Sequence, residues 1–431
     1  MKFKIKYLSP IILTFAILPF FLISSCSKNY QVGYYINTTD LYSEDNYDTL
    51  TFTCKNSKSH DVDIEFEDDT YQQYFTIDGW NKNVYTMHYS TEVAQSVAVN
   101  FLIVKNDEYI SKTVYLHNES DMEKFDSNNF KIHELSVRVI EANKWNVQSS
   151  SYKAIASGTT FITRKVLPND PNFNADTSHK YQFYLIGNWH VWQMFQKINA
   201  NSKYWTNGTD NTFNKFYSLV DLTQAYISNE HTNVGSDTYL WYADFNVANN
   251  EEFDDVNAMC DSNGYPLKLH HSSNENDFVS QQYFIGGYPA NRNDPKKSMY
   301  KYISCHSVDL FGYKNKDWYS NPKELDSISH FLVDKSTWSI GNDIIMEPQT
   351  CEELSAGSSG SLVLDEDGNL IGIYWGGRVI QETNVYCGNI ETLCPITNND
   401  ISGEFSDFSL SSNSSTHWFS NYIDMPVNNE N

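Results

Sequence analysis

The chain has 431 residues and a formal charge of −24, and 15% of its residues are aromatic while only 19% are charged. This length is enough for two or three domains, and the composition indicates a folded, β-rich protein and argues against wholesale disorder. The negative charge argues against nucleic acid as a partner, because neutralising phosphates requires clustered Lys and Arg.

The N-terminus has the pattern of an export signal. Three lysines within the first six residues precede an apolar run at residues 7–23, which is followed by Ser24-Ser25-Cys26. A basic start, a short apolar core and small residues before the cut are typical of a secretory signal. The Cys directly after them resembles a bacterial lipobox, which implies cleavage before Cys26 and a lipid on its sulfur. We expect residues 1–25 to be removed, which changes the charge from −24 to −27, and the rest to be lipid-anchored on the extracellular face of the cell membrane. The alternative is an uncleaved membrane span, since the run is near the lower length for one.

Residues 26–130 are predicted to form a separate β domain. Segments such as residues 62–66 and 97–104 alternate between apolar and polar side chains, with the period of two expected of half-buried strands. Short polar turns separate these segments, which indicates a small β-sandwich. The domain contains no cluster of catalytic residue types, so we expect a spacer or recognition module. Residues 130–139, near the boundary, have an apolar spacing that fits either a helix or a strand.

A candidate general base follows the next strong strand pattern. Residues 181–191 form an apolar run that delivers His190 to its end, where a side chain can face a cleft. A histidine beside Trp189 and Val191 is, on its own, more often a packed structural residue.

A candidate carboxylate lies about fifty residues further on. Residues 240–247 are strand-like, and Asp244 interrupts their apolar positions. An Asp in such a stretch needs a partner to offset its desolvation, and a histidine would supply one. Asp237, Asp254 and Asp255 lie in more loop-like surroundings, where we expect solvated side chains.

A candidate nucleophile lies in the pentapeptide Gly357-Ser358-Ser359-Gly360-Ser361, just before an apolar strand pattern. Small residues allow a tight bend from which the hydroxyl of Ser359 can project. The N–H groups of Gly357 and Ser359 could then converge on one point, as an oxyanion hole requires. Taken alone, the pentapeptide is more typical of a Gly/Ser hairpin loop.

The three candidates occur in the order His, Asp, Ser, which is the order of the chymotrypsin-like enzymes. The chemistry needs each type, because a serine hydroxyl is a poor nucleophile until an imidazole takes its proton. The imidazole in turn needs a carboxylate to fix its tautomer and stabilise its charge.

Several motifs of the chain resemble the successive motifs of trypsin-like serine proteases. They are Gly158-Thr159-Thr160-Phe161-Ile162, Asn188-Trp189-His190-Val191, Asp244-Phe245-Asn246-Val247, Gly287-Tyr288-Pro289 and the serine pentapeptide. Together with the lipobox, they make the chain most similar to the mycoplasma immunoglobulin-protease family of surface lipoproteins, over residues 131–425. The resemblance implies that His190 is the base, Asp244 its orienting acid and Ser359 the nucleophile.

The same resemblance suggests how substrate would bind. Trp375 and Gly376 match the strand that pairs with the substrate backbone, and Glu353, six residues before Ser359, lies where specificity is often set and favours Lys or Arg. Ser358 stands where digestive enzymes carry an Asp that pairs with a newly cut N-terminus, so no such activation switch is expected. The implied substrate is host immunoglobulin heavy chain, with help from a separate immunoglobulin-binding surface protein.

The sequence therefore predicts an all-β protein, an N-terminal β-sandwich followed by a trypsin-like double β-barrel, that acts as a surface-anchored serine endopeptidase with virulence as its context. No metal or cofactor is expected, because the Cys and His spacing matches no zinc pattern and the Asp-rich turns lack the distal Glu of a calcium loop. The alternative hypothesis is a catalytically inactive lipoprotein that uses the same fold to bind a host protein.

Overall fold

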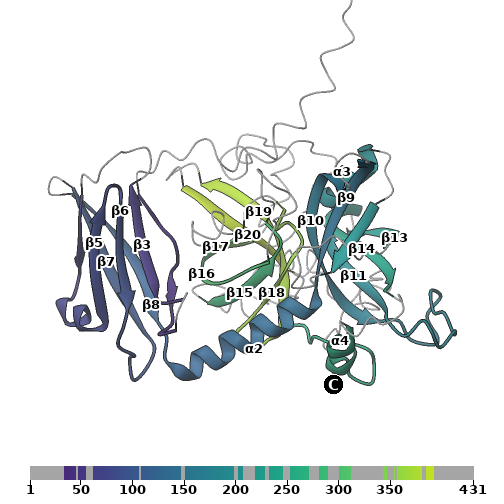
Figure 1. Cartoon of the computed structure of the whole chain (residues 1–431), viewed down its shortest axis with the longest axis horizontal. Coiled ribbons are helices and arrows are strands. Elements are labelled where there is room, and N and C mark those ends of the chain that lie inside the picture. The colour runs from purple at the N-terminus through teal and green to yellow at the C-terminus, as the bar shows by residue number, and fades with distance from the viewer. Residues whose placement is uncertain are drawn as a thin grey trace, which may run out of the picture.

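Figure 1 shows the computed structural model of the chain, in which three β units lie in a row and a long helix, α2, runs beneath the middle one. The described residues are 34–44, 47–54, 62–105, 108–146, 151–198, 202–206, 219–228, 233–245, 253–270, 281–289, 300–311, 343–346, 354, 357–380 and 385–392. The expected signal segment, Cys26 and Glu353 lie outside them. Within these ranges, no helix combines the length and the apolar character that a membrane span requires.

The first unit is a sandwich of two four-stranded sheets. One sheet has the order β1 (Tyr34–Ile36), β3 (Thr49–Cys54), β6 (Val84–Tyr89) and β5 (Phe75–Asn81). The other has the order β2 (Asp40–Leu41), β8 (Glu108–Leu116), β7 (Val97–Lys105) and β4 (Asp63–Phe66), and the 3-10 helix η2 (Asp69–Tyr74) leads into β5. Alternate residues of β3 point inward. Its Leu50 and Phe52 belong to a hydrophobic core of the sandwich that is separate from the core of the other units. The predicted sandwich is confirmed.

Helix α2 (Glu119–Leu135) follows the sandwich and packs against the two six-stranded β units described below, called the barrels. Asn118 caps its start, since the Asn118 side chain accepts a hydrogen bond from the backbone N–H of Asp121. Its buried face includes Phe125 and Ile132, which belong to the core of the barrels and not to that of the sandwich. The predicted boundary at residue 130 therefore falls inside a continuous helix, and the ambiguous segment 130–139 is helix first and strand afterwards.

The second unit, at the right of Figure 1, is a six-stranded antiparallel sheet. Its order is β12 (Ser202–Thr206), β9 (Ser136–Asn146), β10 (Ser151–Lys165), β11 (Gln182–Asn188), β14 (Asn233–Asp244) and β13 (Leu219–Ser228). Every residue of β11 is buried, including the polar Gln182 and Asn188 at its two ends. Two short helices, α3 (Trp189–Ile198) and α4 (Asp254–Met259), follow β11 and β14 along the chain.

The third unit, between the other two, is a closed six-stranded barrel. Its order is β15 (Gln282–Gly287), β16 (Lys301–Phe311), β17 (Asp343–Met346), β20 (Val385–Thr392), β19 (Leu370–Ile380) and β18 (Ser361–Leu364), which pairs back with β15.

The two six-stranded units share one topology. Numbered within each unit, neighbouring strands follow the order 4-1-2-3-6-5 in both, and the unit at the right also brings its edge strands β12 and β13 into contact. A pair of similar antiparallel units joined in one core is the architecture expected of a double-barrel protease. The predicted all-β fold class is confirmed.

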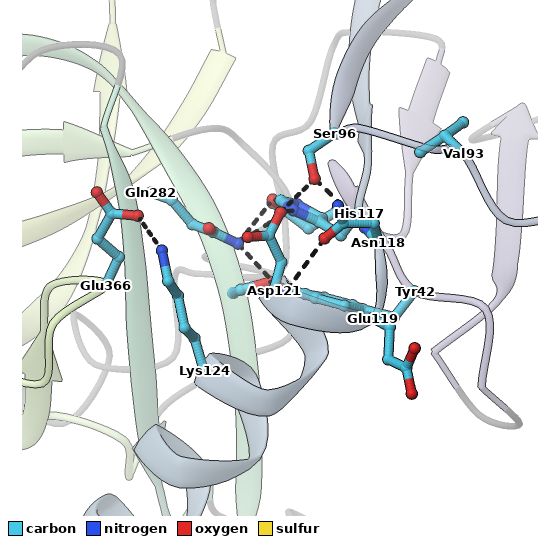
Figure 2. Close-up of polar contacts among 12 residues, drawn as sticks. Tyr42, Val93, Ser96, His117, Asn118, Glu119, Asp121, Lys124, Gln282 and Glu366 are labelled. Carbon is cyan, nitrogen blue, oxygen red and sulfur yellow. Dashed lines mark hydrogen bonds and ion pairs between the residues drawn. The ribbon is translucent and has the colours of Figure 1, made fainter.

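A buried polar network joins the sandwich to the closed barrel. The carboxylate of Asp40 contacts Nε2 of His117 at 2.7 Å and Nδ1 of His306 at 3.2 Å, and the amide of Gln282 donates to it at 3.2 Å. Gln282 also donates to the hydroxyl of Tyr42 at 2.8 Å, and Figure 2 shows Gln282, Tyr42 and His117 gathered at the start of α2. The sandwich is thus fixed to the barrel by charged and polar side chains at this place.

Candidate active site

Residues 357–361, called the serine loop below, form a tight bend just before β18. Gly357 and Gly360 have φ angles of +103° and +94°, in the left-handed region where glycine is favoured. The bend is closed internally, because the N–H of Ser361 donates to the carbonyl of Ser358 at 2.9 Å, and that of Gly360 donates to the carbonyl of Tyr374 at 2.8 Å. The predicted tight bend of small residues before a strand matches this backbone.

Ser359 projects from this loop as a half-buried side chain. Its hydroxyl donates to the backbone carbonyl of Trp375 at 3.1 Å. Within the described parts of the chain, neither the N–H of Gly357 nor that of Ser359 donates to another group. Two N–H groups without an acceptor beside a serine hydroxyl are what an oxyanion hole needs.

The serine loop packs against β10 of the second unit, the six-stranded sheet. The N–H of Thr159 donates to the carbonyl of Ser359 at 2.8 Å, and the Thr159 hydroxyl donates to the carbonyl of Gly357 at 2.9 Å. A Cβ atom on Gly360 would lie 1.8 Å from the carbonyl oxygen of Thr159 and 3.5 Å from the backbone nitrogen of Asn188. The loop therefore also reaches the end of β11, two residues before His190.

His190 is the second residue of α3 and is half-buried. The sequence predicts a strand through Val191, but β11 ends at Asn188 and the chain turns into a helix. This turn is possible because Gly158 of β10 leaves room for Val191: a Cβ there would lie 2.5 Å from the Cγ1 of Val191. The structure thus brings the segments that carry His190 and Ser359 together at one seam between the barrels.

Asp244 lies at the other end of the same pair of strands. In the register of β11 and β14, Asp244 pairs with Gln182 and Thr238 pairs with Asn188, so six residues separate Asp244 from the His190 end. At about 3.4 Å per residue this is roughly 20 Å. The carboxylate of Asp244 instead contacts Nδ1 of His179. This register does not support the prediction that Asp244 orients His190.

Asp237 is the acidic residue of β14 that the register places near His190. It directly precedes Thr238, the partner of Asn188, and therefore stands within β14 and not in a loop as the sequence suggested. Helix α3 folds over this end of the strand, since Trp192 stacks on Tyr239 with 4.6 Å between ring centroids. The signal that could have found Asp237 is an acid at the start of the strand that runs antiparallel to the histidine strand.

Trp375 and Gly376 lie in β19, beside the serine loop. Strand β18 pairs with β19 only as far as Tyr374, while β20 pairs with β19 on its other side through Ile380. Strand β18 thus leaves β19 beyond Tyr374, and an extended peptide could add to β19 on that side. This is the edge that the sequence predicts to bind substrate.

The described residues include no group of three or more His, Cys, Asp or Glu side chains arranged to hold a metal ion. His270, from the His-His pair at 270–271, is engaged elsewhere, because its Nδ1 contacts the carboxylate of Asp365 at 2.7 Å.

One family model matches the chain: Peptidase S7, Flavivirus NS3 serine protease, over residues 299–388. The matched segment is about a fifth of the chain, and it contains β16 to β19 and the serine loop but not His190. Among curated proteins, no sequence matches the chain. The family match supports a chymotrypsin-like serine protease fold for this protein, and it supports a serine protease activity in general terms.

Proposed function

We propose that this chain is a serine endopeptidase in which Ser359 is the nucleophile, His190 the general base and Asp237 the acid that orients the imidazole. The observation that carries the proposal is the meeting of the serine loop with the end of β11, which precedes His190, at the seam between two units of equal topology. The family match over the serine loop supports the same chemistry.

The proposed reaction proceeds through an acyl-enzyme. The Oγ of Ser359 bonds to the carbonyl carbon of the peptide while its proton passes to His190, and the N–H groups of Gly357 and Ser359 hold the oxyanion. The carbon–nitrogen bond then breaks as His190 returns the proton to the leaving amine. A water molecule repeats the sequence and releases the new carboxyl end.

One rearrangement is required before this reaction. The Ser359 hydroxyl donates to the Trp375 carbonyl, so it must rotate away from that carbonyl to donate to His190. A substrate strand on the edge of β19 would bind beside Trp375 and compete for this region. Catalytic hydrogen bonds of this kind are often formed only when substrate is bound.

The substrate and the location of the enzyme are part of the proposal. Recognition of Lys or Arg by Glu353, cleavage of immunoglobulin with a separate binding protein, and a lipid on Cys26 are supported by the sequence motifs and the resemblance to the mycoplasma lipoproteins. An exported protease on the outer face of a cell would meet such a substrate directly.

The test uses the full-length chain in detergent, incubated with unfolded casein and with immunoglobulin, and the new peptide ends are sequenced. We expect the wild type to cleave and Ser359→Ala to be inactive. Asp237→Asn is expected to reduce the rate by about 10⁴-fold, because the imidazole then takes the wrong tautomer. The matched variant Asp244→Asn is expected to change it by less than about threefold, since Asp244 lies roughly 20 Å away.

Two outcomes would contradict the proposal. A loss in Asp244→Asn with full activity in Asp237→Asn would overturn the choice of acid. If the wild type and Ser359→Ala both leave every substrate intact but bind immunoglobulin equally, the rival hypothesis of an inactive host-protein-binding lipoprotein is the better account.

A further inference from the structure

Two neighbouring residues of β10 contact the two halves of the candidate site. Gly158 packs against Val191, the residue after His190, and Thr159 bonds to the serine loop. We propose that the hydroxyl of Thr159 is a positioning group that holds the serine loop at the correct height relative to His190. This inference rests on the proposed function, since it gives Thr159 its role through Ser359.

The Thr159 hydroxyl is fully engaged and fully buried. The Thr159 side chain has 0% exposure, its hydroxyl donates to the carbonyl of Gly357 at 2.9 Å, and it accepts from the N–H of Tyr288 at 3.0 Å. The carbonyl of Gly357 belongs to the residue whose own N–H is proposed to bind the oxyanion. A bond to that carbonyl restricts rotation of Gly357, which has the widest conformational freedom of any residue type.

Steric contact alone fixes how closely the serine loop approaches β10 and β15, but it does not fix the orientation of the loop. At this seam the glycines leave no spare volume, because a Cβ on Gly287 would lie 1.8 Å from the Oγ of Ser361 and 3.0 Å from the Oγ1 of Thr159. The hydrogen bonds of Thr159 add direction to that close packing, since they weaken steeply when bent. The hydroxyl links three segments: β10, the serine loop and the end of β15.

The side chain of the residue after Gly357 does not anchor the loop. Ser358 is fully buried, and the described residues offer its hydroxyl no hydrogen-bond partner. Ser358 therefore provides no ion pair that could hold the loop from within. Besides the bonds that close the bend internally, Thr159 of β10 supplies a polar anchor from outside the loop.

The same strand sets the position of the histidine. Val191 contacts Gly158, so the start of α3 rests on β10 one residue away from the point where Thr159 meets the serine loop. The separation of His190 and Ser359 is therefore set through two consecutive residues of one strand. Near-attack geometry of this kind is sensitive, and a misplacement of about 1 Å can reduce a rate by about a hundredfold.

The experiment compares three variants of the full-length chain: Thr159→Val, Thr159→Ser and Thr160→Val. Thr160 is the matched control, because it is also 0% exposed but its hydroxyl donates to the carbonyl of Ile186 within the first barrel. Each variant is treated with a fluorophosphonate probe, and the maximal labelling rate is separated from probe affinity. Thermal unfolding and hydrogen exchange of the serine-loop amides are measured on the same samples.

We expect Thr159→Val to lower the maximal labelling rate of Ser359 by about tenfold to a hundredfold with little change in probe affinity. Exchange of the loop amides should become faster in the same variant. Thr159→Ser should restore both properties to within about threefold of the wild type, because it keeps the hydroxyl. Thr160→Val should lower the unfolding temperature without slowing the labelling by more than about threefold.

The proposal is overturned if Thr159→Val and Thr160→Val label at the same rate, or if Thr159→Ser stays as slow as the valine variant. Failure of the proposed function has a different signature: the wild type itself is then not labelled at Ser359. In that case faster loop exchange in Thr159→Val alone would show that Thr159 holds the loop, and the positioning role would still be rejected together with the enzyme.

Discussion

The molecule has two seams that differ in chemistry. The contacts between the serine loop and β10, called the neutral seam below, are made by backbone groups, glycines and the hydroxyl of Thr159. The seam between the sandwich and the closed barrel is ionic, with Asp40 between His117 and His306. A neutral seam keeps its geometry over a wide pH range, which suits a site where a rate depends on position. An ionic seam keeps its strength only while its groups hold their charges.

Burial makes the ionic seam demanding. The side chains of Asp40 and His117 are 0% and 5% exposed, so each charge depends on its partner. His117 also contacts Asp121 at 3.1 Å, and Asp121 accepts a hydrogen bond from Ser96. Figure 2 shows His117, Asp121 and Ser96 linked in this way beside the first turn of α2. The sandwich is therefore expected to stay docked only while this network is complete.

The largest effect is expected from filling the neutral seam. Gly360→Ala combines an unfavourable φ of +94° with a Cβ only 1.8 Å from a backbone oxygen of Thr159. We expect the free energy of unfolding to fall by about 5 kcal/mol or more, and we expect no labelling of Ser359 by the fluorophosphonate probe. Gly79→Ala is the control, because Gly79 has a φ of +80° but a Cβ there meets nothing within 4 Å, so it should cost about 1 kcal/mol. Urea unfolding of both variants measures the difference, and equal losses would mean that the seam is not close-packed.

Breaking the ionic seam is expected to have the next largest effect. Asp40→Asn keeps the size of the side chain but leaves His117 and His306 without the carboxylate between them. We expect the free energy of unfolding to fall by about 4 kcal/mol at pH 6, because a buried charge then lacks its partner. Glu123→Gln, an exposed change on α2, should cost less than about 0.5 kcal/mol. Denaturant unfolding at pH 6 decides, and a small loss in Asp40→Asn would show that the sandwich docks by apolar contact alone.

The ionic seam should also make stability depend on pH. Burial alone lowers the pKa of His117, but its hydrogen bonds to Asp121 and Asp40 outweigh burial and raise the pKa from 6.5 to about 9. Burial likewise raises the pKa of Asp40, and the charge of His306 with the bonds to His117 and His306 outweighs it and holds that pKa well below 3.8.

These two pKa shifts determine how the stability of the folded state changes with pH. The raised pKa of His117 gives a contribution that is complete below pH 6.5 and is lost as pH rises through about 9. The lowered pKa of Asp40 gives a contribution that is present above pH 3.8 and is lost as pH falls below that value. Between pH 6 and pH 9.5 we expect the free energy of unfolding of the wild type to fall by on the order of 3 kcal/mol. This fall should be absent from the variant His117→Gln. Parallel pH profiles of the two proteins would contradict this assignment.

The smallest effect is expected from the ion pair at the surface of the closed barrel. Lys124 of α2 and Glu366 are 2.9 Å apart, and both side chains are exposed. Figure 2 shows this pair. Lys124→Ala should lower stability by about 0.5 kcal/mol or less, and the difference should vanish in 1 M salt. A loss comparable with that of Asp40→Asn would mean that exposed pairs, and not the buried network, hold the units together.

The sequence predicted what depends on local patterns. Period-two alternation marked the strands of the sandwich, and a largely apolar run marked β11 as a strand. The serine loop was recognisable because its small residues are needed for a bend of positive φ. These features are set by neighbours along the chain.

The proposed acid, Asp237, could not be predicted in this way, because the choice depends on strand pairing. Asp244 and Asp237 lie on one strand, and only its antiparallel register with β11 shows which end faces the histidine. A sequence gives the residues of a strand but not the end at which its partner begins. Asp244 interrupts an apolar stretch, but its carboxylate contacts His179.

The two seams were also beyond sequence reasoning. Thr159 and Gly357 are 198 residues apart, and Asp40 and His117 are 77 residues apart. No local pattern links a buried hydroxyl or a buried carboxylate to a partner at such distance. Thr159 was visible only as part of the motif Gly158-Thr159-Thr160.

The central claim is that Ser359 is a reactive nucleophile at the neutral seam. The most direct measurement treats the full-length chain with a fluorophosphonate probe and locates the adduct by mass spectrometry. The account predicts one adduct, on the Oγ of Ser359 in the wild type, and none in Ser359→Ala or in wild type unfolded by urea. An adduct on another serine, or equal labelling of the wild type and Ser359→Ala, would contradict it.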